Sequence, residues 1–312
     1  MSGAPPTALL FPGQGAQRAA MGEPWRDVEA WRLTEEISAH TGTDVEELLL
    51  KADDATLRET DLAQLAVFSL SVIVLHHVRS REDPEGASGV VAYAGHSLGE
   101  YVALYAAGAL TLPDAARLVA VRGRAMRQAA QRDPGTMAVL VRADAETAHT
   151  MVEAARTAGH RVWVANLNAP GQVVVSGSHE GIDHVESRAG DYDAKVLRVA
   201  VGGAFHTPLM ASAGEELARA LLAVPFAASH EPVVANVDAR AYRGGDVDWP
   251  ELEVRQLTSP VLWERGVRTL HDTVGCVRFL ELGPGRALTG MVRRTLSDAT
   301  VITVNTPTTP LH

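Results

Sequence analysis

The chain has 312 residues, of which 46% are hydrophobic and 21% are charged, and its formal net charge at pH 7 is −10. These values are typical of a globular protein with one large domain, or a large and a small one. An acidic chain without a lysine- and arginine-rich run is not expected to bind nucleic acid. The single cysteine, Cys276, excludes an intramolecular disulfide and a cysteine-based zinc site, and the N-terminus lacks the pattern of a secretory signal, so we expect a cytoplasmic protein.

The first predicted element is a short apolar strand, residues 7–11, which leads into the glycine-rich turn PGQGAQ. Polar helices are predicted over residues 24–51. Residues 61–79 form a long apolar stretch, but they include Gln64, serines and two histidines and are short for a membrane span. We therefore predict a buried helix there and no association with a membrane.

An apolar strand over residues 89–95 and an apolar helix over residues 99–110 follow. A further helix begins at Leu112-Pro113-Asp114, with proline in its first turn, and runs to about Gln131. Strands with little polar alternation, joined by helices, predict an α/β fold whose parallel sheet is covered on both faces.

The pattern changes after Asp133-Pro134-Gly135. The next elements follow the order β-α-β-β-α-β of a ferredoxin-like unit. They are expected over residues 137–143, 145–159, 161–168, 172–178, 179–190 and 194–201. Because the α/β pattern then resumes, we predict a large subdomain of residues 1–132 and 199–312 and an inserted small subdomain of residues 133–198. The last residues, 307–312, are expected to fray.

A serine lies between two glycines in Gly95-His96-Ser97-Leu98-Gly99, where the apolar strand passes into the apolar helix. On such a sharp turn the backbone is strained and the serine hydroxyl projects out of the sheet. The glycines leave room where strand and helix approach each other, and the helix N-terminus favours developing negative charge. We predict that Ser97 is a nucleophile; the alternative is a tight turn with an incidental serine.

A nucleophilic serine needs a base, and the chain has 12 histidines. His96 is adjacent to Ser97, but neighbouring side chains at such a turn point apart. His206 follows the last strand of the small subdomain in a glycine-rich loop, just before Thr207-Pro208, which is typical of a helix start. His206 is therefore the candidate base.

With these two residues, the sequence resembles the malonyl-CoA:acyl carrier protein transacylases and the acyltransferase domains of polyketide synthases, almost from end to end. The motifs that carry the resemblance occur in the family's order. They are LFPGQGAQ (10–17), GHSLGEYVAL (95–104), VRGRAM (121–126), ANLNAPGQVVVSG (165–177), AFH (204–206), QLTSPVLW (256–263) and ELGPGRALTG (281–290). The resemblance implies an α/β-hydrolase-like large subdomain with a parallel sheet and a ferredoxin-like small subdomain.

The resemblance also implies a mechanism. Ser97 would attack a thioester and hold the acyl group as an ester, and His206 would move the protons. The main-chain carbonyl of Gln256 would orient the histidine in place of a carboxylate. The backbone N–H groups of Leu98 and Gln14 would form the oxyanion hole.

Arg122 falls on an apolar helical stripe with Ala115, Leu118 and Met126. A buried arginine is costly unless it is paired, so a structurally paired or partly exposed Arg122 is one interpretation. The resemblance implies another, in which Arg122 binds the free carboxylate of a malonyl-type acyl group through its planar fork. The other expected substrate-binding residues are Gln64, His96, Asn166, Asn168 and Phe205. For Gln64, Asn166 and Asn168 the alternative is that these amides satisfy buried backbone groups.

Phe205 resembles the bulky residue of malonyl-selective relatives, where it crowds the position of an α-methyl group. Many of those relatives have histidine where this chain has Gly203. We expect this difference to leave room in the pocket, so a larger dicarboxylic acyl group is an alternative substrate.

The function predicted from these residues is ping-pong transfer of a malonyl-type group from coenzyme A to the phosphopantetheine thiol of an acyl carrier protein. The acyl-CoA is a substrate, no permanent cofactor or metal is expected, and the protein is expected to be a monomer. Because carrier proteins are generally acidic, a local basic patch is needed, for which Arg286, Arg293 and Arg294 are candidates. The alternatives are transfer of a different acyl group, including from carrier to carrier, a proofreading thioester hydrolase, and an inactive carrier-binding module.

Overall fold

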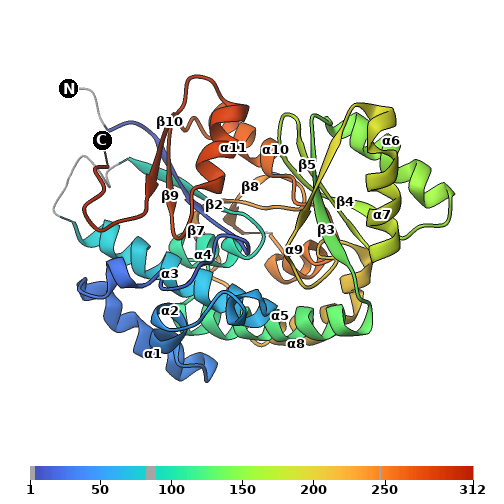
Figure 1. Ribbon diagram of the computed structural model, residues 1–312. Helices are drawn as coiled ribbons and strands as arrows, with labels where there is room; N and C mark the ends of the chain where they lie inside the picture. The colour runs from blue at the N-terminus through green and yellow to red at the C-terminus, as the bar shows by residue number, and fades with distance from the viewer. Residues whose placement is uncertain (1–3, 82–88, 246, 312) are drawn as a thin grey trace.

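The larger sheet carries the predicted nucleophile. The computed structural model describes residues 4–81, 89–245 and 247–311. This sheet has the strand order β10-β9-β1-β2-β7-β8, and its neighbours are parallel except for β7 and β8 (Figure 1). The strands are β1 (Thr7–Phe11), β2 (Val90–Gly95), β7 (Ser229–Val234), β8 (Ala241–Gly244), β9 (Arg278–Leu282) and β10 (Thr300–Val304). The predicted parallel sheet is confirmed, with one antiparallel strand at its edge.

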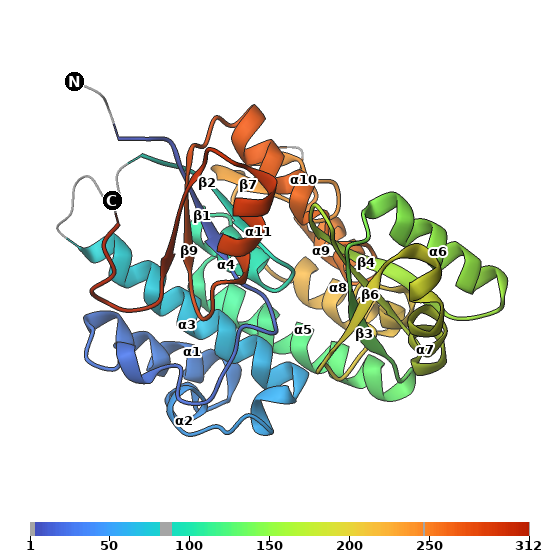
Figure 2. The same cartoon turned by 45° about the horizontal axis from the view of Figure 1, so that its top comes forward.

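Both faces of this sheet are covered, because alternate residues of its central strand enter different cores. Leu9 and Phe11 pack with the first group of helices, whereas Ala8 and Leu10 pack with the second. The first group is α1 (Leu33–Thr41), α2 (Val45–Leu50), α3 (Thr60–Ser80), α4 (Gly99–Ala106), α5 (Leu112–Arg132) and α8 (Gly214–Leu222). The second group is α10 (Trp263–Arg268) and α11 (Ala287–Thr295). The two groups lie on opposite sides of the sheet in Figure 2.

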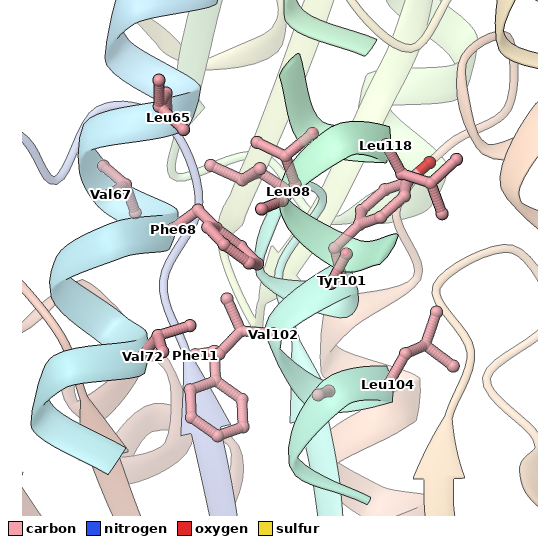
Figure 3. Packing of buried hydrophobic residues seen from close by; sticks show 14 of the residues in the cluster. Phe11, Leu65, Val67, Phe68, Val72, Leu98, Tyr101, Val102, Leu104 and Leu118 are labelled. Atoms are coloured by element: carbon pink, nitrogen blue, oxygen red, sulfur yellow. The ribbon is translucent and has the colours of Figure 1, made fainter. Parts of the chain in front are cut away.

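Helix α3 is the long apolar element predicted at residues 61–79. By length and composition it is apolar enough to cross a membrane, but 78% of its most apolar window is buried inside the fold. Phe68 lies beside Phe11 of β1 and Val102 of α4, and all three side chains are fully buried (Figure 3). Burying each such side chain contributes about 1.5–3 kcal/mol. The prediction of a buried core helix is confirmed.

A second, smaller sheet lies beside the first and is antiparallel, with the order β4-β5-β3-β6. Its strands are β3 (Thr136–Val141), β4 (Val162–Ala169), β5 (Gln172–Gly177) and β6 (Lys195–Val199), with helices α6 (Ala145–Thr157) and α7 (His179–Arg188). The chain order of these elements is the predicted β-α-β-β-α-β. Leu167 N–H donates to the Val261 carbonyl, and Val261 N–H donates to the Ala165 carbonyl, both at 2.9 Å. These bonds attach β4 to the segment that follows α9 (Trp249–Gln256).

Two local predictions are wrong. The helix after Ser97 was expected to reach residue 110, but α4 ends at Ala106, because Gly108 adopts a left-handed conformation with φ +83°. The C-terminal residues were expected to fray, but Leu311 is fully buried and the Thr309 carbonyl accepts from Arg81 at 2.6 Å. The tail packs because it supplies both an apolar side chain and carbonyl acceptors.

The segment before α3 is less regular than predicted. The polar helices expected over residues 24–51 are two short 3₁₀ turns, Glu23–Trp25 and Glu29–Arg32, followed by α1 and α2. Gly42, with φ +72°, ends α1, and the Asp44 side chain accepts from Glu47 N–H to begin α2.

Candidate active site

Ser97 stands at the carboxyl end of β2, at the turn into α4. Its φ of +53° lies in the left-handed region, which costs a non-glycine residue about 1–3 kcal/mol. A Cβ on Gly95 would lie 1.8 Å from the Gly99 carbonyl carbon, and a Cβ on Gly99 would lie 2.1 Å from the Phe11 carbonyl oxygen. Both glycines are therefore required by the close approach of β1, β2 and α4.

His206 lies next to Ser97 although 109 residues separate them, with 2.8 Å between Ser97 Oγ and His206 Nε2. Its Nδ1 lies 2.9 Å from the Gln256 main-chain oxygen. A carbonyl oxygen only accepts, so the neutral ring that fits both contacts carries its hydrogen on Nδ1. In that tautomer His206 Nε2 accepts the Ser97 hydroxyl hydrogen.

The His206 imidazole is neutral in this environment. Burial and the positive charge of Arg122 lower the pKa of His206 to about 3. The ring is therefore unprotonated at physiological pH, which is the form that accepts a proton. Burial also lowers the pKa of His96, whose Nε2 lies 2.8 Å from Asn168 Oδ1.

Arg122 of α5 is 1% exposed and reaches the nucleophile. One guanidinium nitrogen, Nη1, donates to Gln64 Oε1 at 2.6 Å. The other, Nη2, donates to Gln256 Oε1 at 2.8 Å and to Ser97 Oγ at 3.1 Å. Within the described part of the chain, these hydrogen-bond acceptors are neutral and no direct ion pair includes Arg122. A buried cation whose direct hydrogen-bond partners are all neutral can bind an anionic ligand, because such a ligand compensates the cost of desolvation.

Asn236, which follows β7, is not among the residues predicted from the sequence. Its Oδ1 accepts from Ser97 N–H at 2.6 Å, and its Nδ2 donates to the Gly95 carbonyl at 2.7 Å. Its own N–H donates to Glu100 Oε2 at 3.1 Å. Asn236 therefore holds both sides of the turn that carries Ser97. The sequence signal for Asn236 was a polar residue directly after an apolar strand. Parallel strands end at the same edge of a sheet, so such a residue lies near the end of the strand that carries Ser97.

A cavity of about 230 Å³ opens beside Ser97, between the two sheets. Most of the predicted site residues line it, namely Gln14, His96, Ser97, Arg122, Asn166, Asn168, Phe205 and His206. Gln64, Leu98 and Gln256 do not line it; Gln64 and Gln256 instead hold Arg122. The smaller sheet supplies an apolar wall from Met137, Val139, Val174 and Val199.

The two backbone donors proposed for an oxyanion hole come from adjacent parallel strands. Gln14 lies in the turn after β1, and Leu98 follows Ser97 at the end of β2. The Phe11 carbonyl accepts from His96 N–H at 3.0 Å, which joins the two turns. Over residues 4–81, 89–245 and 247–311, neither the Gln14 nor the Leu98 N–H donates to another backbone or side-chain acceptor.

Gly203 lies against the Phe205 ring, and the expectation that this glycine leaves room in the pocket stays a prediction. A Cβ on Gly203 would lie 2.7 Å from Phe205 Cε1 and 2.9 Å from Ala130 Cβ. The Phe205 ring, on the cavity wall, therefore occupies the space beside the glycine. The absent side chain at residue 203 accommodates this ring.

The family model of the acyl transferase domain matches residues 8–308. The chain belongs to this family. The resemblance found in the motifs is confirmed, and the enzyme is an acyltransferase. Among the described residues, no group of three or more histidine, cysteine, aspartate or glutamate side chains is arranged to hold a metal ion.

Relatives of known name agree with the family. A malonyl CoA-acyl carrier protein transacylase from Bacillus subtilis (strain 168) is 36% identical over 307 residues, which cover 97% of this chain and 94% of the relative. The structure of a malonyl-CoA:acyl carrier protein transacylase from Xanthomonas oryzae pv. oryzae matches with a TM-score of 0.90 at 32% identity, covering 98% of this chain and 96% of that one. A structure of a type II polyketide synthase acyl-carrier protein in complex with its malonyl-transacylase matches with a TM-score of 0.89 at 31% identity, covering 96% of each chain.

Proposed function

We propose that the acyltransferase moves a malonyl group from coenzyme A to an acyl carrier protein through an ester on Ser97. The observation that carries the proposal is the position of Arg122. This buried cation donates to the Ser97 hydroxyl oxygen, and the same hydroxyl oxygen lies 2.8 Å from His206 Nε2. A short acyl group with a terminal carboxylate can therefore reach the nucleophile and the guanidinium at the same time.

In the first half-reaction, Ser97 Oγ attacks the thioester carbonyl carbon and passes its proton to His206 Nε2. The N–H groups of Leu98 and Gln14 stabilise the resulting oxyanion; one such donor is worth about 2.7–4 kcal/mol of barrier. The carbon–sulfur bond then breaks, and His206 gives the proton to the departing coenzyme A thiolate. The product is a malonyl ester on Ser97.

In the second half-reaction, the phosphopantetheine thiol of the carrier loses its proton to His206 and attacks the ester. The carbon–oxygen bond breaks, and His206 returns the proton to Ser97. The Gln256 carbonyl, 2.9 Å from His206 Nδ1, holds the ring in one tautomer during both steps. The relatives named as acyl carrier protein transacylases support the carrier as the acceptor.

The charge of Arg122 explains why the carboxylate matters for catalysis as well as for binding. His206 must become an imidazolium while Ser97 attacks, and the adjacent guanidinium opposes that charge. A bound carboxylate places a negative charge directly on the guanidinium, next to His206, and reduces this opposition. Acetyl or fatty acyl groups supply no such charge, so they should react slowly.

The proposal is tested by intact-protein mass spectrometry after mixing the enzyme with malonyl-CoA or acetyl-CoA. We expect a malonyl adduct on the wild-type enzyme, none on Ser97→Ala, and loss of the adduct when a holo carrier protein is added. No adduct from any carboxylated acyl-CoA would refute the donor. An adduct that disappears equally fast without the carrier would instead support the hydrolase alternative.

A further inference from the structure

Two buried carboxylates, Glu100 of α4 and Glu253 of α9, adjoin Arg122 without lining the cavity. Glu100 is 2% exposed and Glu253 is 0% exposed. Glu100 Oε2 accepts from Gln256 Nε2 at 2.8 Å, and Gln256 Oε1 accepts from Arg122 at 2.8 Å. One amide side chain therefore connects a buried carboxylate to the buried guanidinium, and the mechanism above assigns no step to either acid.

Glu253 is the less well satisfied of the two. Among the described residues, neither Glu253 oxygen has a hydrogen-bond partner, and the same is true of the Tyr101 hydroxyl and Arg122 Nε. The Tyr101 ring lies beneath the guanidinium, with 5.7 Å between Arg122 Cζ and the ring centroid. An ionised carboxylate without hydrogen bonds is costly at such a site unless a nearby positive charge compensates it.

Few charged groups act on Glu100 and Glu253. The titratable and charged groups that act on the two acids are Tyr101 from α4 and Arg122 from α5, together with the acids themselves. His206 and His96 lie farther along the same site, and burial keeps both rings neutral. With Arg122 charged, two ionised acids leave a net negative charge and two protonated acids leave a net positive charge. Only one shared proton makes the cluster neutral, which a buried cluster favours.

We propose that Glu100 and Glu253 share one proton and one negative charge that balances Arg122, and that they take up a second proton from solvent when an acyl carboxylate binds Arg122. The inference rests on the proposed function, because it requires a carboxylate at the guanidinium. The reason is charge neutrality. The acyl carboxylate replaces the acid pair as the counter-ion of Arg122, so the remaining negative charge on the pair is no longer compensated.

The directions of the pKa shifts agree with this linkage. Burial and mutual repulsion raise the pKa of Glu100 well above its usual value, and burial raises the pKa of Glu253 to about 7, although the charge of Arg122 opposes the shift. A carboxylate bound to Arg122 removes that opposition, so the pair binds protons more tightly in the complex. Malonyl binding is then coupled to proton uptake, and it weakens as the pH rises through the titration of the pair.

Isothermal titration calorimetry tests the proposal with Ser97→Ala, which cannot be acylated. Malonyl-CoA and acetyl-CoA are each titrated in two buffers of different ionisation enthalpy at the same pH, near 7.5. Acetyl-CoA is the control for protons taken up by the coenzyme A phosphates. We expect malonyl-CoA to take up more protons than acetyl-CoA, with a difference approaching one proton per site.

The triple variant Ser97→Ala/Glu100→Gln/Glu253→Gln should abolish this difference, because both glutamines keep the size of the side chains and neither titrates. Ser97→Ala/Glu251→Gln changes an exposed acid of the same helix and should retain the difference. Equal proton numbers for the two ligands on Ser97→Ala would overturn the inference without any substitution at the pair. Failure of malonyl-CoA to bind more tightly than acetyl-CoA would instead refute the proposed function, and this inference with it.

Discussion

Replacing Arg122 with alanine should reduce malonyl transfer far more than acetyl transfer. The substitution removes a guanidinium that is 1% exposed and that donates to Gln64, Gln256 and Ser97. Both acyl groups lose whatever positioning these contacts give to Ser97. Only the malonyl group also loses a counter-ion for its carboxylate.

The magnitude follows from the burial of Arg122. Removing one partner of a buried, hydrogen-bonded charge pair costs about 2–5 kcal/mol. At about 1.4 kcal/mol for each factor of ten, the ratio of malonyl to acetyl kcat/KM should fall by roughly 30-fold to several thousand-fold. The absolute acetyl rate should change less, because removal of the positive charge also makes His206 easier to protonate.

The assay measures the rate of Ser97 acylation by each acyl-CoA with quenched samples and intact-protein mass spectrometry. Arg124→Ala removes an exposed arginine of the same helix and serves as the matched control. Arg122→Lys keeps the charge but loses the planar fork, so its malonyl rate should lie between those of the wild type and the alanine variant.

Equal losses for malonyl-CoA and acetyl-CoA would refute the reasoning, because they would show that Arg122 acts only through the position of Ser97. A variant that unfolds is recognised by circular dichroism. In that case the lysine variant, which keeps the buried charge, decides the question.

Four further predictions concern the surroundings of Ser97. Asn236→Ala should leave the partly buried Ser97 N–H without its side-chain acceptor, lower the free energy of unfolding by about 1–3 kcal/mol and slow acylation. Urea unfolding and acylation rates check this, and an unchanged variant would show that Asn236 does not hold the turn at Ser97. As the pH is lowered through 6.5, kcat/KM for malonyl-CoA should not fall, because the lowered pKa of about 3 keeps His206 neutral. A fall in kcat/KM below pH 6.5 would contradict this. Gly203→Ala should displace the Phe205 ring and destabilise the fold by about 1–3 kcal/mol in the same urea assay, and a stable variant would show that the ring moves freely. Arg286 is exposed and lies next to residues of the cavity wall, so Arg286→Glu should repel an acidic carrier protein. The KM for the carrier protein should rise more than the KM for malonyl-CoA. Equal changes in the two values would place the carrier elsewhere.

Much of the framework was predictable because it depends on residues close together in the chain. The turn at Ser97 needs glycines two residues away on each side, and the structure explains both by clashes below 2.2 Å. The buried stripe of α5 follows from helical spacing, which put Arg122 on the same face as Ala115, Leu118 and Met126; its 1% exposure is a finding of the structure. The order of elements in the smaller sheet follows from strand and helix periods in the same way.

The polar network around that framework depended on the tertiary structure. The Gln256 carbonyl meets His206 from 50 residues away, and Asn236 reaches Ser97 across 139 residues. The sequence motifs located Gln256; they contain Glu100 without a role for it, and they do not include Asn236 or Glu253. These polar side chains follow no helical or strand period in the sequence, because each is positioned by one contact with a distant backbone group or charge.

The sequence by itself determined where the nucleophile stands and which helix presents the arginine, since local backbone geometry and hydrophobic period decide both. The folded chain decided which acids lie behind Arg122 and that the Phe205 ring occupies the space beside Gly203. It also decided that the C-terminal residues pack against α3. These features depend on contacts between segments that are far apart in the sequence. An unpaired charge or an unfilled space is costly only once those segments bury it away from water.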